Sequence, residues 1–330
     1  MRAPNRRRRT ATPRERGIAI VTVLLVVALT ATLAASVLWR EQVATRDVEN
    51  QRLSMQTMWT ERAAVEWARA TLRAQTITSN VTYAGQSWAV PVSDTRLADL
   101  LPPSAAAVNG ELSRAWISGS VEDAQARLNL SDLVERTAPG QPWHANAAAV
   151  LAYRRLLEGL SLDPALAKRT ADYMTRSLSQ APTEGKWPLQ LVGAADLARV
   201  DGYDAHAIAA LTPYVTFLPD ITTVNANTAS EQVLVAAIPT LAASQARRIT
   251  ERRATAHFVS TGELAEYLAP TQAGATLPDG ALVGVDSGYF LVHCRVHGAR
   301  INVRIDTLIA RYGIGNFSWT QVVWVHRLAS

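Results

Sequence analysis

The chain has 330 residues, of which 48% are hydrophobic, 33 are basic and 28 are acidic. Because a domain usually has about 100–200 residues, we expect more than one compact unit. The one cysteine, Cys294, excludes an intrachain disulfide and is expected to be a small buried core residue.

The basic excess is confined to the start of the chain. Residues 1–17 contain seven arginines and one glutamate, a net charge of +6, and the remaining 26 basic and 27 acidic residues nearly cancel. The body of the protein therefore lacks the positive charge typical of a nucleic-acid-binding domain. A basic segment directly before an apolar stretch indicates a cytoplasmic N-terminus, with the bulk of the chain across the membrane.

Residues 18–39 are an uncharged apolar run without glycine or proline. As a helix this run is roughly 33 Å long, enough to cross a bilayer. The helical pattern continues, so we predict one helix over residues 18–76, half of it in the membrane. Trp59 and Trp67 lie on this helix and are expected to pack in a core rather than to bind a partner. A cleaved secretory signal is the alternative, but its apolar region is only about 7–15 residues long.

Beyond the helix the sequence predicts an α+β fold. Residues 77–130 and 281–330 are rich in β-branched residues and turn signals, and Gly298 separates two strand patterns as in a hairpin. Residues 131–280 are rich in alanine and leucine and predict an all-α domain inserted into the sheet unit. The expected helices are 143–160, 163–179, 189–200, 204–212, 227–238, 242–254 and 260–268.

The residues around Gly17 and Ile18 carry the first family resemblance. Arg-Glu-Arg-Gly-Ile-Ala-Ile-Val-Thr, ending at Thr22, resembles the leader boundary of type IV pilins and type II secretion pseudopilins. The resemblance implies that a prepilin peptidase cuts between Gly17 and Ile18 and that Ile18 becomes a methylated N-terminus. An ordinary single-span anchor is the alternative. Thr22 stands where most pilins have a glutamate that pairs with the terminal amine of a neighbouring subunit. The absence of this glutamate suits a subunit at the tip of a filament.

Residues 222–268 resemble a helix-hairpin-helix unit. We expect Asn227 or Thr228 to cap the first helix and Pro239 to lie in the hairpin. DNA-binding members have glycines that let the hairpin approach a phosphate, but Thr240 occupies one of those positions here. Phosphate binding is therefore not expected. The second helix ends with four arginines that are candidates for contact with an acidic surface: Arg247, Arg248, Arg252 and Arg253.

Three motifs together resemble the type II secretion protein K family over nearly the whole chain. The first is the acidic strand leading to an Asn-Leu segment, the second is the NxNTA…VL…IP helix, and the third is the tryptophan-rich C-terminal strand with Trp319 and Trp324. The matching residues of the first two motifs include Asp123, Leu128, Asn129, Leu130, Asn225, Asn227, Thr228, Ala229, Val233, Leu234 and Pro239.

This family resemblance implies a non-enzymatic minor pseudopilin at the tip of a periplasmic pseudopilus, which assists the export of folded proteins across the outer membrane. The implied partners are the minor pseudopilins I and J, the prepilin peptidase, the bacterial inner membrane and, where the tip meets them, exported proteins. Nucleic acid is not an expected partner.

Metal and catalytic sites are not expected. Family members usually carry a calcium-binding acidic loop, but residues 171–188 offer only Asp172 and Glu184, too few oxygens for calcium. The six histidines are scattered, and no serine-hydrolase, P-loop or zinc-protease motif is present. Two alternatives remain: a membrane-anchored helix-hairpin-helix protein that binds DNA in a competence-type system, and a membrane-bound enzyme.

Overall fold

The computed structural model describes residues 13–100, 114–179, 187–272 and 274–328. The chain divides into two compact units, residues 1–60 and residues 61–330, and each is described by itself. The helix α1 (Pro13–Thr78) begins in the first unit and ends in the second. The prediction of one long helix is therefore confirmed, and α1 extends a few residues beyond the predicted bounds at each end.

The first unit consists of the apolar part of α1. Its large apolar side chains between Ile20 and Trp39 are all more than half exposed to solvent. Within the described residues, α1 is the one helix long and apolar enough to cross a membrane, and the window that qualifies is not buried at all. An apolar surface of this extent needs lipid or other helices around it.

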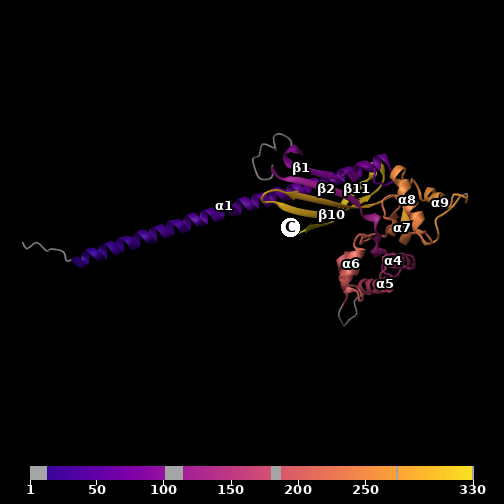
Figure 1. Ribbon diagram of the computed structural model, residues 1–330, viewed down its shortest axis with the longest axis horizontal. Coiled ribbons are helices and arrows are strands. Elements are labelled where there is room, and N and C mark those ends of the chain that lie inside the picture. The colour runs from indigo at the N-terminus through magenta and orange to yellow at the C-terminus, as the bar shows by residue number, and fades with distance from the viewer. Residues whose placement is uncertain (1–12, 101–113, 180–186, 273, 329–330) are drawn as a thin grey trace, which may run out of the picture. The chain divides into compact units, whose positions relative to one another are not determined.

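The second unit is built on an antiparallel five-stranded sheet with strand order β1-β2-β9-β10-β11 (Figure 1). The strands β9 and β10 form the hairpin predicted around Gly298, with Cys294 opposite Ile305. Cys294 is buried as expected, and burial raises the pKa of its thiol to about 11. The strands are β1 (Val92–Arg96), β2 (Trp116–Asp123), β9 (Tyr289–His297), β10 (Asn302–Tyr312) and β11 (Trp319–Leu328).

The last turns of α1 cover one face of this sheet. Val65, Ala68 and Leu72 are buried, as their helical spacing predicts. The expectation for the two tryptophans is wrong, because Trp59 is 59% exposed and Trp67 is 53% exposed. Trp67 lies off the stripe of buried residues Val65, Ala68 and Leu72, so the helical period alone did not place it in the core.

The segment directly after α1 also differs from the prediction. Residues 79–91 form no strand; they contain the 3₁₀ turn η1 (Ser87–Ala89) and local side-chain contacts instead. The Gln86 side chain donates to Val81 O at 2.7 Å and accepts from Trp88 Nε1 at 2.7 Å. These local hydrogen bonds outcompete the β propensity of the segment, and the sheet starts only at Val92.

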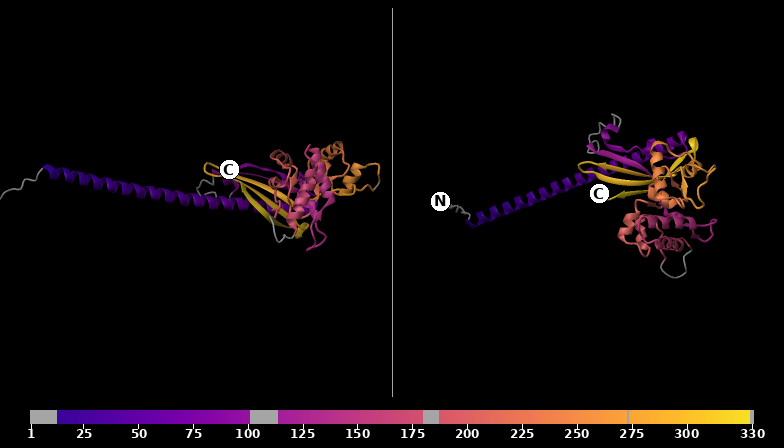
Figure 2. Two further views of the ribbon diagram at one scale, coloured as in Figure 1. Left: turned by 90° about the horizontal axis from the view of Figure 1, so that it is seen from below. Right: turned by 45° about the vertical axis from the view of Figure 1, so that its right-hand side comes forward.

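The helices come from the middle of the chain and lie beside the sheet (Figures 1 and 2). Their shared core contains fully buried Tyr153, Leu156, Leu211 and Phe258. The helices are α4 (Ala147–Gly159), α5 (Ala165–Leu178), α6 (Ala205–Leu211), α7 (Glu231–Ala237), α8 (Ala243–Thr255) and α9 (Thr261–Leu268), and a short α2 (Leu97–Leu100) follows β1.

One predicted α-helix is absent. Residues 189–200 contain only a short 3₁₀ helix, η5 (Ala194–Arg199). The Asp196 side chain accepts from Val192 N at 2.9 Å and Gly193 N at 3.2 Å, which fixes a tight turn before it. With Gly193 at its start the segment is too short for a stable α-helix.

Short two-residue strands connect the helices to the rest of the unit. The pairs are β3 (Leu128–Asn129) with β6 (Val215–Thr216), β4 (Val134–Glu135) with β5 (His144–Ala145), and β7 (Val224–Asn225) with β8 (Val283–Gly284). The remaining 3₁₀ helices are η3 (Ala124–Ala126), η4 (Leu130–Leu133) and η6 (Gly315–Phe317).

Candidate functional site

Four polar residues from distant parts of the chain, three of them buried and Thr228 partly buried, meet at the end of β2. We call Asp123, Asn225, Thr228 and Ser287 the polar junction. The Asp123 Oδ2 atom accepts hydrogen bonds from Asn225 Nδ2 at 2.8 Å, Thr228 Oγ1 at 2.6 Å and Ser287 Oγ at 2.7 Å. Its Oδ1 atom accepts from the backbone of Gln125 at 2.9 Å. The junction therefore links β2, β7, the segment before α7 and the segment before β9.

The polar junction also fixes the segment that follows α1. Asn225 Nδ2 donates to Thr82 O at 3.0 Å, and Ser287 N donates to Thr82 Oγ1 at 3.1 Å. Arg311 of β10 donates to the same hydroxyl at 3.0 Å and to Ser287 O at 2.7 Å. Burial lowers the pKa of Arg311 to about 10. One cluster thus holds the exit of α1, the sheet and the helical part together.

The chemistry of the junction is structural. Burial raises the pKa of Asp123, and its four hydrogen-bond donors act in the opposite direction by stabilising the carboxylate. Within the described part of the chain, the buried side-chain atoms that lack a partner are Glu61 Oε1, Arg252 Nη1 and Thr307 Oγ1, and none belongs to the junction. The hydrogen bonds of the junction therefore stabilise one arrangement of the segments that meet there.

An open groove of about 860 Å³ borders the junction. Tyr83 and His257 stack in its wall with ring centroids 3.8 Å apart, and Arg127 and Arg253 also line it. Both guanidinium groups already have protein partners, since Arg127 donates to Glu122 at 2.7 Å and Arg253 to Ala226 O at 2.7 Å. The two guanidinium groups in the wall of the groove are thus each held by a group of their own chain.

A second buried cluster forms around Asn129. Its Nδ2 atom donates to Asp132 Oδ1 at 2.8 Å and Asp220 O at 3.0 Å, and its Oδ1 atom accepts from Leu218 N at 2.9 Å. Burial raises the pKa of Asp132 to about 7. The neighbouring Leu130 is fully buried in the helical core. The Asn-Leu motif thus joins the start of the helical part to residues 218–222.

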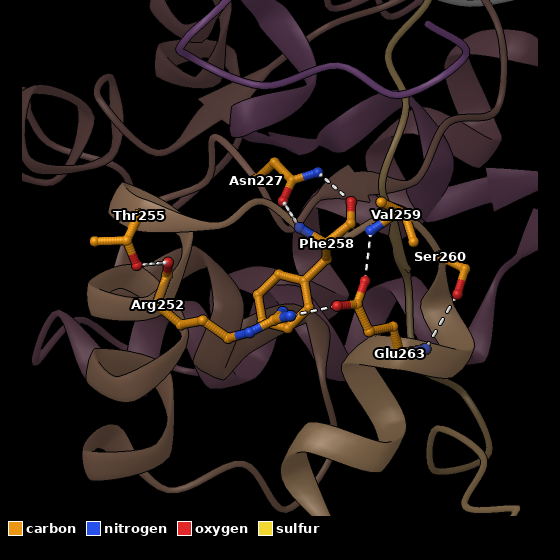
Figure 3. Close-up of polar contacts among 7 residues, drawn as sticks. All are labelled: Asn227, Arg252, Thr255, Phe258, Val259, Ser260 and Glu263. Atoms are coloured by element: carbon orange, nitrogen blue, oxygen red, sulfur yellow. Dashed lines mark hydrogen bonds and ion pairs between the residues drawn. The ribbon is translucent and has the colours of Figure 1, made fainter.

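The third cluster surrounds Asn227 and Phe258 (Figure 3). The Asn227 side chain accepts from Phe258 N at 2.8 Å and donates to Phe258 O at 3.0 Å. Arg252 lies over the Phe258 ring at 4.1 Å and forms an ion pair with Glu263. Of the four arginines considered for contact with an acidic surface, Arg252 and Arg253 thus bind groups of their own chain.

The structure corrects the predicted helix cap. Ser230, not Asn227 or Thr228, caps α7, and its side chain accepts from Val233 N. Asn227 and Thr228 point to buried partners instead, and Ala229 is fully buried. The sequence signal for this helix start is Ser230 followed by Glu231, because a serine at the N-cap and an acidic residue in the first turn both favour the start of a helix.

The hairpin between α7 and α8 has the predicted position. It follows Ile238, includes Pro239, and places Thr240 at a φ of 64°. This is the left-handed region that favours glycine, and a threonine there keeps the turn but adds a side chain where a phosphate would approach.

The remaining predicted residues are placed as follows. Gly17, Ile18 and Thr22 lie on α1, and the Thr22 hydroxyl donates to Ala19 O at 2.9 Å. Glu184 lies outside the described residues, and Asp172 pairs with Lys168 Nζ at 2.5 Å. Among the residues that the structure describes, no group of three or more histidine, cysteine, aspartate or glutamate side chains is arranged to hold a metal ion.

Ser287, Thr82 and Arg311 were missed from the sequence. Each contributes to the polar junction through partners more than 20 positions away, such as Arg311 with Thr82 and Ser287 with Asp123. Serine, threonine and arginine are common in loops and on strands, and no local pattern distinguishes these three.

Comparison with known proteins gives a consistent result. Two family models described as type II secretion system protein K match residues 126–220 and residues 224–285. The chain is 28% identical over 319 residues to type II secretion system protein K of Pseudomonas aeruginosa, covering 89% of this chain and 88% of that protein.

Among solved structures, the GspK-GspI-GspJ complex from the type 2 secretion system of enterotoxigenic Escherichia coli contains a similar chain. The TM-score is 0.63 at 20% sequence identity, and the match covers 85% of this chain and 99% of that chain. At this identity the likeness concerns the fold, which is the pilin-like α+β fold predicted from the sequence. The Asn129 and Asn227 clusters lie mainly within the residues that the family models match, and the polar junction has two of its four residues, Asn225 and Thr228, in the second matched range.

Proposed function

The chain belongs to the type II secretion system protein K family, and from this premise we propose that it is the tip subunit of a periplasmic pseudopilus. It is a minor pseudopilin: α1 anchors it and then packs with the helices of other subunits, and the filament assists the export of folded proteins across the outer membrane. The observation that carries the proposal is one apolar membrane-length helix continuous with a pilin-like sheet unit.

Two features support the tip position. Thr22 replaces the glutamate that pairs with the terminal amine of a neighbouring subunit, so this subunit does not need one ahead of it. The six helices α4–α9 also add bulk beside the sheet, and bulk of this kind would obstruct a subunit stacked above it.

The proposed topology follows from charge. The seven arginines before Gly17 favour a cytoplasmic N-terminus, and the single span then puts residues 61–330 in the periplasm. The anchoring membrane is the bacterial inner membrane, where the prepilin peptidase would cut between Gly17 and Ile18.

We propose a structural role without catalysis. The polar junction has its hydrogen-bonding groups satisfied within the chain, and the described residues contain no candidate metal cluster. The partners of the chain are the minor pseudopilins I and J. The internal contacts of Arg252 and Arg253 and the threonine at position 240 give no support to DNA binding.

Co-expression of the full chain with the minor pseudopilins I and J and the prepilin peptidase tests the proposal. The tagged chain, extracted from membranes in detergent, should retain both partners through affinity purification and should not shift a DNA duplex on a gel. Failure to retain either partner, or salt-sensitive binding of DNA, would contradict it.

A further inference from the structure

The two edges of the five-stranded sheet differ in how they are protected. The edge strand β1 has only five residues, follows Pro91, and carries Asp94 and Arg96. Short length, proline and charge are the usual means by which proteins prevent pairing at a sheet edge. The Asp94 carboxylate is also bound by His297 at 3.2 Å. This edge is therefore unsuited to accept another strand.

The opposite edge, β11, lacks most of these protections. It has ten residues, no proline, no lysine and no acidic residue, and its pairing within the described residues is with β10 alone. Its apolar side chains Trp319, Val323, Val325 and Leu328 are between 37% and 53% exposed. The pairing of β11 with β10 has one irregularity in register, near Val323, and the pairing of β1 with β2 also has one. The two edge strands therefore differ in length and charge, and not in the number of register irregularities.

Contacts with α1 hold β11 in place near both ends. Arg69 donates to Thr320 O at 2.8 Å and to Thr320 Oγ1 at 3.1 Å. Arg327 pairs with Glu61 at 2.6 Å. An edge that is already rigid loses little conformational entropy when a partner strand is added to it.

Aromatic side chains line the face of β11 that points away from α1. Trp319 lies opposite Tyr312 with ring centroids 4.6 Å apart, and Trp324 stacks on His326 at 4.2 Å. Trp319 is exposed, Tyr312 and Trp324 are partly buried, and tryptophan and tyrosine are frequent among the residues that contribute most to protein–protein binding. They extend the edge into a surface on which the side chains of an added strand can pack.

Charge gives the preferred sequence of that added strand. From Trp319 to Val325 the edge carries no formal charge, and its C-terminal end carries exposed His326 and, on the neighbouring strand, exposed Arg304, while Arg327 pairs with Glu61. The complementary segment is uncharged and apolar over most of its length and places a carboxylate at this basic end.

We propose that β11 is a docking edge that accepts an extended strand of a neighbouring minor pseudopilin, so that the sheet continues from one subunit into the next. Main-chain hydrogen bonds supply the affinity, and the Trp319–Leu328 side chains select an uncharged strand with an acidic end. This inference rests on the proposed function, since it names the surface by which the chain binds a subunit of the same assembly.

The test combines backbone exchange with edge substitutions. In the detergent-extracted complex with minor pseudopilins I and J, amide hydrogen exchange of residues 319–328 should slow by at least about tenfold relative to the chain purified alone. The double variant V323K/V325K should lose at least about tenfold in recovered partner, because lysines on an edge strand oppose pairing. The matched control is L151K/V192K, two exposed apolar residues in the helical part, which should recover both partners.

The outcomes separate this inference from the function on which it rests. Unchanged exchange of residues 319–328 in a complex that does form would overturn the inference and leave the proposed function intact. Full recovery of both partners by V323K/V325K would also overturn the inference and leave the proposed function intact. If the unaltered chain recovers no partner at all, the proposed function fails, and the docking edge fails with it. The exchange measurement uses the unaltered chain, so it decides the matter even where the double variant does not fold.

Discussion

Replacing Asn225 by alanine should destabilise the second unit more than a usual single substitution. The side chain is fully buried, and its amide nitrogen donates to Thr82 O, Asp123 Oδ2 and Ser287 Oγ within 3.0 Å, while its oxygen accepts from Asn227 N at 2.9 Å. Alanine removes these bonds, leaves Thr82 O and Asn227 N without the partner that Asn225 provides, and takes one of four donors from the buried Asp123 carboxylate.

The expected loss follows from these contacts. An unsatisfied buried polar group costs about 1–3 kcal/mol, and the substitution leaves two such groups, Thr82 O and Asn227 N, besides weakening the hydrogen bonding of Asp123. We therefore expect Asn225→Ala to lower the free energy of unfolding by about 3–5 kcal/mol. For a unit of this size that corresponds to a melting temperature lower by roughly 6–15 °C.

The assay is thermal unfolding of the full chain in detergent, followed by near-ultraviolet circular dichroism. The matched control is Asn302→Ala, because Asn302 is exposed on β10 and its side chain accepts a hydrogen bond from exposed Arg295 at 3.4 Å. The control should shift the free energy by less than about 0.5 kcal/mol. Equal shifts for the two variants would refute the view that the polar junction holds α1, the sheet and the helices together.

Three further predictions concern single side chains. Burial raises the folded-state pKa of Asp132 from 3.8 to about 7, so the stability linked to its protonation is complete below about pH 3.8 and is lost as the pH rises through 7. Between about pH 4 and pH 8 the free energy of unfolding should therefore fall by up to about 4 kcal/mol more for the unaltered chain than for Asp132→Asn. Parallel pH profiles for the two chains would contradict this. The His293 ring lies between Glu122, at 3.6 Å, and Asp306, at 2.7 Å, and the Glu122 carboxylate is the main cause that raises the pKa of His293. Because that stabilisation is complete below about pH 6.5 and is lost as the pH rises through the folded-state value, urea unfolding should give a larger stability difference between the unaltered chain and His293→Gln at about pH 5.5 than at about pH 8.5, and a pH-independent difference would exclude the interaction. Phe258 is fully buried beneath Arg252 and against Tyr267, so Phe258→Ala should cost about 3–5 kcal/mol in urea unfolding, and a cost below about 1 kcal/mol would show that the Figure 3 cluster is not part of the folded core.

The parts of the fold that were predictable from the sequence depend on local pattern. The absence of glycine and proline between Gly17 and Gly85 predicted α1, and the apolar alternation around Gly298 predicted the β9–β10 hairpin. In both cases the residues that decide the structure are close together in the chain, so periodicity and turn chemistry were sufficient.

The parts that were not predictable depend on long-range contacts. The helical period identified an apolar stripe on α1 but could not tell which turns of it a sheet would cover, so Trp67 was assigned to the core although it is exposed. Asn227 and Thr228 have side chains suited to capping, yet tertiary partners at Phe258 and Asp123 take them and Ser230 becomes the cap. The motif residues were thus recognisable in the sequence, but their roles were not.

Mass spectrometry of the mature N-terminus tests the central claim that this chain is a pseudopilin. The full chain would be expressed with and without the prepilin peptidase, purified from membranes, and its terminal peptide sequenced. We predict a methylated N-terminus at Ile18 when the peptidase is present and a retained leader, residues 1–17, when it is absent. A leader that stays attached in the presence of the peptidase, or a cut near Ala35, would contradict the assignment to a pseudopilus.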